Sequence, residues 1–322
     1  MEKENPGLLK STGALFRLIR WPDLLIIILT QYLLMYAVIK PFLFADHPSW
    51  LTGNVPFMLL VTATVFIAAG GYIINDFRDV DIDSVNHPGK NVLEKFFSER
   101  SVFLFYYVFN ILGILAGAVL SIILRSLPVG LLFPFIAGLL WLYSLKYKEI
   151  PALGNIIVAF LTAMVVFVVW YFEFLQLRLT PEQFSAVLPD LKTVNRIFTG
   201  YAVFAFLITF FREIIKDMED KEGDLRSRRL TIPMALGQKR TTLIVFALIL
   251  LTLALMAFSL LILGRMGHWS VFGFLLVTVV LPLIYLSVKV FFTKSAEDYH
   301  FLSNICKMIM VTGVLSMQLL SF

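Results

Sequence analysis

The stretch "GYIINDFRDVDIDSVNHPGK", Gly71–Lys90, begins within an apolar run long enough to cross a membrane and continues into charged sequence. It gathers four aspartates at the end of that run: Asp76, Asp79, Asp81 and Asp83. On a helix, which turns about 100° per residue, Asp76, Asp79 and Asp83 fall within an arc of about 60°, whereas Asp81 points away. The spacing therefore predicts three carboxylates on one face of a helix end.

A second acidic group repeats this spacing later in the chain. Asp217, Asp220 and Asp224 have the same offsets, and Glu213 lies one turn earlier on the same stripe. Like charges on one helical face repel one another, and a divalent cation removes that repulsion. Mg²⁺ favours carboxylate oxygens and often bridges a protein to substrate phosphates. The two groups are therefore interpreted as a paired magnesium and diphosphate site, the alternative being an ordinary solvated acidic face.

The amino-acid composition of the chain is that of an integral membrane protein. Apolar residues make up 59% of the 322 residues and charged residues 15%, with a mean hydropathy of +0.85. The apolar runs are continuous, which favours helices over barrel strands. We expect an all-α protein, a single domain over residues 1–322, with nine spans at about 23–42, 55–74, 102–124, 128–145, 152–175, 196–215, 241–263, 270–291 and 301–321. Glu173 is expected at the membrane interface, at the outer end of the fifth span.

The distribution of charge predicts the orientation. About twenty Lys and Arg fall on one side of the spans and six on the other, which places the N-terminus and both acidic segments in the cytoplasm. The net charge of +5 is then explained by topology beside anionic lipid, and no nucleic-acid partner is expected. Cys306 is the only cysteine and the four histidines are scattered, so any metal must be held by oxygen.

Three segments carry a resemblance to a known family. "NDFRDVDIDSVNHP" resembles the N-D-x-x-D-x-x-x-D signature of the UbiA superfamily of membrane prenyltransferases, "DMEDKEGD" is similar to its second aspartate motif, and "YSLKYKEIPALGN" resembles its Tyr and Lys stretch. The resemblance implies nine helices around a central cavity, capped by cytoplasmic loops at about 75–101 and 212–240. It also implies Mg²⁺-dependent transfer of a polyprenyl group from a prenyl diphosphate to a lipophilic acceptor in the membrane.

The resemblance also implies roles for individual residues. Those matching the two catalytic motifs are Asn75, Asp76, Asp79, Asp83, Asp217, Asp220 and Asp224, with the six aspartates as metal ligands. Those expected to contact the substrate diphosphate are Tyr143, Lys146, Lys148, Arg212, Lys216 and Lys90.

Within this superfamily the motifs are most similar to geranylgeranylglyceryl phosphate geranylgeranyltransferases. That branch implies geranylgeranyl diphosphate as donor, a prenylated glycerol phosphate as acceptor and a prokaryotic cell membrane. The segment "NHPGKNVLEKFF" departs from the branch, because the expected Asn-Arg-Pro-x-Arg and Pro-Ser-Gly patterns are absent. An aromatic prenyltransferase of quinone biosynthesis therefore stays open as an alternative. A cation-coupled transporter is a more remote one, because its carboxylates would lie near mid-span.

Overall fold

The computed structural model describes residues 8–46, 54–80, 93, 96–226 and 229–321. Within these residues all regular elements are helical, and nine helices are long and apolar enough to cross a membrane. This confirms the predicted all-α class with nine spans. The spans run over Trp21–Leu43, Val55–Arg78, Glu99–Ile123, Leu127–Leu145, Leu153–Leu179, Pro181–Glu219, Gln238–Arg265, Trp269–Lys289 and Ala296–Leu320.

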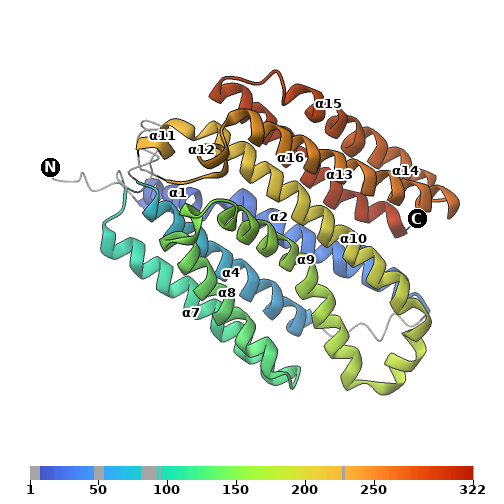
Figure 1. The fold of residues 1–322 in the computed structure, drawn as a ribbon. Coiled ribbons are helices and arrows are strands. Elements are labelled where there is room, and N and C mark those ends of the chain that lie inside the picture. The colour runs from blue at the N-terminus through green and yellow to red at the C-terminus, as the bar shows by residue number, and fades with distance from the viewer. Residues whose placement is uncertain (1–7, 47–53, 81–92, 94–95, 227–228, 322) are drawn as a thin grey trace. The chain divides into compact units, whose positions relative to one another are not determined.

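One of two compact units carries the first aspartate motif. It comprises Met1–Leu29, Thr52–Lys148 and Phe172–Leu179. Its helices are α1 (Leu8–Leu18), the first part of α2 (Trp21–Leu33), α4 (Asn54–Arg78), α7 (Glu99–Ile123), α8 (Leu127–Leu145) and the end of α9 (Leu153–Leu179). Helix α4 packs along both α7 and α8, which also pack against each other (Figure 1).

Small residues allow these three helices to approach closely. A Cβ at Gly113 of α7 would lie 2.9 Å from the side chain of Ile67 on α4, and one at Gly117 would overlap the ring of Phe133 on α8. Larger residues at these two positions would clash with the neighbouring helix. Close backbone approach is a common basis for helix association in membranes, where hydrophobic burial gives little drive.

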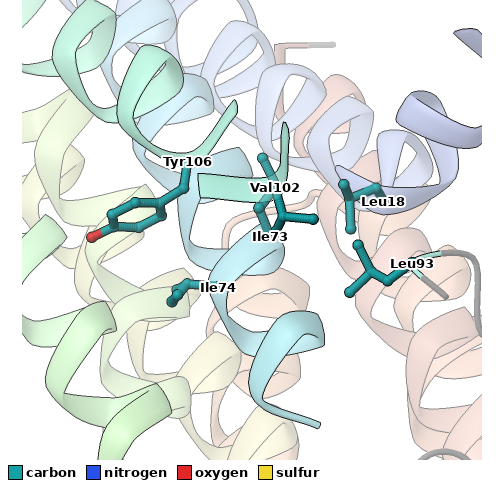
Figure 2. Packing of buried hydrophobic residues seen from close by; sticks show 6 residues of the cluster. All are labelled: Leu18, Ile73, Ile74, Leu93, Val102 and Tyr106. Atoms are coloured by element: carbon teal, nitrogen blue, oxygen red, sulfur yellow. The ribbon is translucent and has the colours of Figure 1, made fainter. Parts of the chain in front are cut away.

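A hydrophobic cluster anchors the C-terminal end of α4. Ile73 and Ile74, immediately before the first motif, are fully buried. Figure 2 shows the cluster, which consists of Leu18, Ile73, Ile74, Leu93, Val102 and Tyr106. The packing of this turn holds the next residues, Asn75 and Asp76, in a defined position.

The second unit carries the second aspartate motif. It comprises Thr30–Leu51, Glu149–Tyr171 and Thr180–Phe322. Besides the end of α2 and most of α9, it contains η1 (Leu34–Ile39), α3 (Lys40–Leu43), α10 (Pro181–Glu219), α11 (Lys221–Arg226), α12 (Ile232–Leu236), α13 (Gln238–Arg265), α14 (Trp269–Leu275), η4 (Leu276–Val280), α15 (Leu281–Lys289), α16 (Ala296–Leu315) and η5 (Ser316–Ser321). Helix α10 packs against α13 and α16 (Figure 1).

Helix α10 is much longer than the predicted span at 196–215. It runs for 39 residues, from Pro181 to Glu219. Pro181 occupies the first turn, where the missing N–H costs nothing, and Glu182 there suits the helix dipole. Hydropathy missed this first part because it is rich in polar residues, although those residues are compatible with a helix.

The side chain of Glu173, near the end of α9, is buried within the protein. The residue is only 1% exposed, and its Oε2 atom has no hydrogen-bond partner among the described residues. A carboxyl group buried in this way within a membrane span is costly.

We therefore expect Glu173→Met to stabilise the protein. The substitution keeps a similar length and removes a buried polar atom whose missing hydrogen bond costs about 1 to 3 kcal/mol. Thermal unfolding in detergent should show a higher Tm than wild type. The exposed Glu182 gives a matched control, since Glu182→Met should leave the Tm nearly unchanged. A lower Tm for Glu173→Met would show that the carboxyl group makes a favourable interaction.

Candidate active site

The first aspartate motif lies on the last turn of α4. The helix ends at Arg78, but the N–H of Asp79 still donates to the carbonyl oxygen of Asn75 at 3.0 Å, so the helical turn continues through Asp79. Side chains four residues apart then share one face. The Asn75 Nδ2 atom accordingly donates to Asp79 Oδ2 at 3.0 Å.

Two cations hold the carboxylates of this motif. Arg20 Nη2 donates to Asp76 Oδ1 at 2.5 Å, and Lys148 Nζ donates to Asp79 Oδ1 at 2.7 Å. Lys148 follows α8, in the short 3₁₀ turn Tyr147–Glu149, and its side chain is only 7% exposed. These ion pairs offset the repulsion between neighbouring carboxylates.

Arg20 is a site residue that none of the sequence motifs includes. It lies between α1 and α2, its backbone φ is 51°, and its guanidinium lies over the Tyr72 ring at 5.4 Å. Burial opposes the charged form of Arg20, but the Asp76 carboxylate outweighs this and raises the pKa of the guanidinium above its usual value. The sequence feature that could have indicated this role is the position of Arg20, a cationic residue directly before the first span.

The oxygen atoms of this motif are suited to supply some of the ligands of a magnesium ion. The Asn75 Oδ1 atom is buried and has no hydrogen-bond partner among the described residues, so a hard oxygen donor stands beside Asp76 and Asp79. No three His, Cys, Asp or Glu side chains in the described part of the chain form a complete metal site. Proteins commonly hold Mg²⁺ by one or two carboxylates, with water and substrate phosphates supplying the other ligands. Asn75, Asp76 and Asp79 suit that arrangement.

The second motif bends where the sequence predicted one continuous stripe. Asp217 lies in the last turn of α10, Asp220 follows the helix end with φ −86° and ψ 9°, and Asp224 belongs to the short helix α11. Two helix-type bonds persist across the bend: the N–H of Asp220 donates to Lys216 O at 2.9 Å, and the N–H of Asp224 donates to Asp220 O at 3.1 Å. The side chain of Asp217 accepts a hydrogen bond from Asn155 Nδ2 at 2.8 Å.

The cations of the second motif share one carboxylate. Arg212 Nη1 donates to Glu213 Oε1 at 2.7 Å, and Lys216 Nζ lies 3.7 Å from Glu213 Oε2. The buried Nε atom of Arg212 has no hydrogen-bond partner among the described residues. Arg212 thus keeps a donor available for an anion.

The other predicted residues are placed as follows. Tyr143 is half-buried on α8, whereas Lys146, the C-terminal cap of that helix, is exposed. Of the two lysines in this stretch, it is therefore Lys148 that contacts the first motif. Asp83 and Lys90 lie outside the described residues.

Comparisons with known proteins agree with these motifs. The model of the UbiA prenyltransferase family matches residues 26–305. The chain belongs to this family. The resemblance stated from the three sequence segments is thereby confirmed. With nine apolar helices among its described residues, this UbiA-family chain is an integral membrane protein.

Several relatives of this UbiA-family chain are digeranylgeranylglyceryl phosphate synthases. The one from Methanobrevibacter smithii is 28% identical over 207 residues, 63% of this chain and 66% of the relative. The one from Pyrococcus horikoshii is 31% identical over 189 residues, 58% of this chain and 59% of the relative. The matched segments thus span less than two thirds of the length of each of these two relatives.

Solved structures support the fold. One described as digeranylgeranylglyceryl phosphate synthase superposes with a TM-score of 0.60 at 21% identity, covering 97% of this chain and 98% of that one. A UbiA homolog from Archaeoglobus fulgidus bound to DMAPP and Mg²⁺ gives a TM-score of 0.53 at 16% identity, covering 94% and 99%. At these identities the likeness shows a shared UbiA fold.

Proposed function

We propose that this protein transfers a polyprenyl group from a prenyl diphosphate to the hydroxyl group of a prenylated glycerol phosphate, with Mg²⁺ as cofactor. The observation that carries the proposal is the arrangement at the end of α4. Two carboxylates and a buried amide oxygen lie there on one helical turn, each carboxylate beside a cation. Magnesium ligands and phosphate-binding cations are both needed to bind a diphosphate.

The residues of each motif would take complementary roles. Some of the metal ligands would come from the first motif, namely Asn75, Asp76 and Asp79. Others would come from the second motif, namely Asp217, Asp220 and Asp224. Asp83 is assigned as a ligand from sequence alone. When bound, Mg²⁺ stabilises the negative charge that develops on the diphosphate leaving group.

The cations of the site would bind the diphosphate directly. Arg20 and Lys148 each pair with a carboxylate in the structure. We propose that both side chains turn to phosphate oxygens in the complex, as do Arg212 and Lys216, whose present partner is Glu213. Cations aimed at the leaving group stabilise its charge as the bond to the allylic carbon breaks. The apolar surroundings of the spans would keep water from the cation-like carbon until the acceptor hydroxyl attacks.

Location and domain organisation form part of the proposal. We place the two acidic segments, at about 75–101 and 212–240, and the N-terminus on the cytoplasmic side of a prokaryotic cell membrane, as the distribution of Lys and Arg indicates. We propose that residues 1–322 act as one catalytic domain in which both motifs serve the same diphosphate. The donor we propose is geranylgeranyl diphosphate, since the named relatives are digeranylgeranylglyceryl phosphate synthases.

Lys148 and its exposed neighbour Lys146 allow a matched test of the phosphate-binding role. We expect Lys148→Met to reduce kcat/KM for the prenyl diphosphate by about a hundredfold, because a preorganised cation near the leaving group is lost. Lys146→Met removes the same charge two residues away and should reduce kcat/KM by less than about threefold. Steady-state kinetics of the purified variants measure both. Equal losses at the two positions would contradict the role given to the contact with Asp79.

The acceptor is tested by competition. Purified protein is given geranylgeranyl diphosphate, Mg²⁺ and an equimolar mixture of geranylgeranylglyceryl phosphate, 4-hydroxybenzoate and dihydroxynaphthoate, and the products are identified by mass spectrometry. We expect the prenylated glycerol phosphate as the main product. Prenylation of an aromatic acid instead would overturn the ether-lipid assignment and leave prenyl transfer intact.

A further inference from the structure

A hydrogen bond joins α9 and α10 at the second motif, and its donor, Asn155, belongs to neither aspartate motif. Asn155 Nδ2 donates to Asp217 Oδ2 at 2.8 Å, across 62 residues of sequence. Asn155 is 8% exposed, so this amide is committed to the interior of the protein. Both residues belong to the second compact unit.

The local backbone fixes where Asn155 points. Ala152, just before α9, has a φ of 64°, which is uncommon for a residue with a Cβ. The N–H of Ile156 donates to Ala152 O at 2.9 Å and closes the first turn, which contains Asn155. The first turn of a helix carries partial positive charge and favours a nearby carboxylate. The amide and the end of α9 thus act on Asp217 in the same direction.

We propose that Asn155 is a positioning residue that orients the Asp217 carboxylate toward the metal. The inference deepens the proposed function and rests on it. The bond engages Oδ2, and none of the described residues donates a hydrogen bond to Oδ1. One oxygen is therefore held and the other remains for a cation.

The neutrality of this partner distinguishes Asp217 from the first motif. Asp76 and Asp79 are each held by a cation, which must give way before a metal can bind with full charge complementarity. The amide of Asn155 fixes the carboxylate while leaving its charge for the metal. Partners that orient a metal ligand in this way are worth about 10 to 100-fold in metal affinity.

Binding of Mn²⁺ in the presence of inorganic diphosphate tests the inference without turnover. Free Mn²⁺ is followed by electron paramagnetic resonance for wild type, Asn155→Leu, Asp217→Asn and the double variant. Leu matches Asn in size and lacks the donor. We expect Asn155→Leu to weaken Mn²⁺ binding at least tenfold in the wild-type background. In the Asp217→Asn background the further loss should be below about threefold, because the charge that Asn155 would orient toward the metal is already gone.

The controls separate positioning from general damage. Asn195→Leu removes an exposed amide on α10 and should leave Mn²⁺ binding unchanged. Thermal unfolding checks that each variant folds, and Asn155→Ala replaces the Leu variant if that one does not. Unchanged Mn²⁺ binding in a folded Asn155 variant, or the same loss in both backgrounds, would overturn this inference alone. Failure of the wild type to bind Mn²⁺ with diphosphate would overturn the proposed function as well.

Discussion

Asp79→Asn is expected to lower the rate of prenyl transfer by about a thousandfold. The amide has the shape of the carboxylate, so packing at the end of α4 is kept. The charge that Lys148 contacts at 2.7 Å, and that would bind the metal, is lost. Loss of one preorganised electrostatic contact in an active site lowers kcat by about a hundredfold to a thousandfold. We expect the loss of a metal ligand to give a decrease near the larger of these values. Turnover of a radiolabelled prenyl diphosphate by purified protein measures the effect.

Two controls test whether the position of the carboxylate decides the loss. Asp190→Asn removes a charge from an exposed site on α10 and should leave the rate nearly unchanged. Asp81→Ala removes the aspartate that the helical spacing places off the acidic face, and we expect a mild effect. Comparable losses for Asp81→Ala and Asp79→Asn would show that the helical-face interpretation is wrong.

Removal of the metal is expected to abolish activity completely and reversibly. In excess EDTA the carboxylates of the two motifs would repel the diphosphate, so turnover should fall below detection, and added Mg²⁺ should restore it. The structure adds a specific expectation for stability. Because Arg20 and Lys148 already pair with Asp76 and Asp79, EDTA should change the Tm of the ligand-free protein very little. Full turnover in chelator would contradict the magnesium assignment.

The fold was predictable because membrane spans depend on properties that can be read along the chain. Continuous apolar runs predict helices, since the bilayer leaves backbone groups no other partners. The same reasoning failed where structure does not follow hydropathy. The polar start of α10 is helical because Pro181 and Glu182 suit the first turn of a helix. Glu173 is buried by packing between helices, which hydropathy does not show.

The candidate site was predictable only as far as spacing along a helix reaches. Offsets of three and four residues indicated that Asp76 and Asp79 share a face, but spacing cannot show which distant residue meets them. Arg20 contacts Asp76 across 56 residues, and Asn155 contacts Asp217 across 62. The sequence also offered two lysines near the end of α8, and the 3₁₀ turn after that helix selects Lys148. Such contacts arise from packing between helices, which local patterns do not encode.

The most direct measurement is the reaction of the purified protein in lipid vesicles with geranylgeranyl diphosphate, geranylgeranylglyceryl phosphate and Mg²⁺. Inorganic diphosphate and the lipid product are quantified in the same samples. We predict that the two are formed in equal amounts and that the product carries a second prenyl chain in ether linkage. We also predict that both form about a thousandfold more slowly with Asp79→Asn and that neither appears in EDTA. Lipid product formed at the wild-type rate by Asp79→Asn in EDTA would contradict the role of the two aspartate motifs. Absence of both products from the wild type with every acceptor tested would contradict prenyl transfer itself.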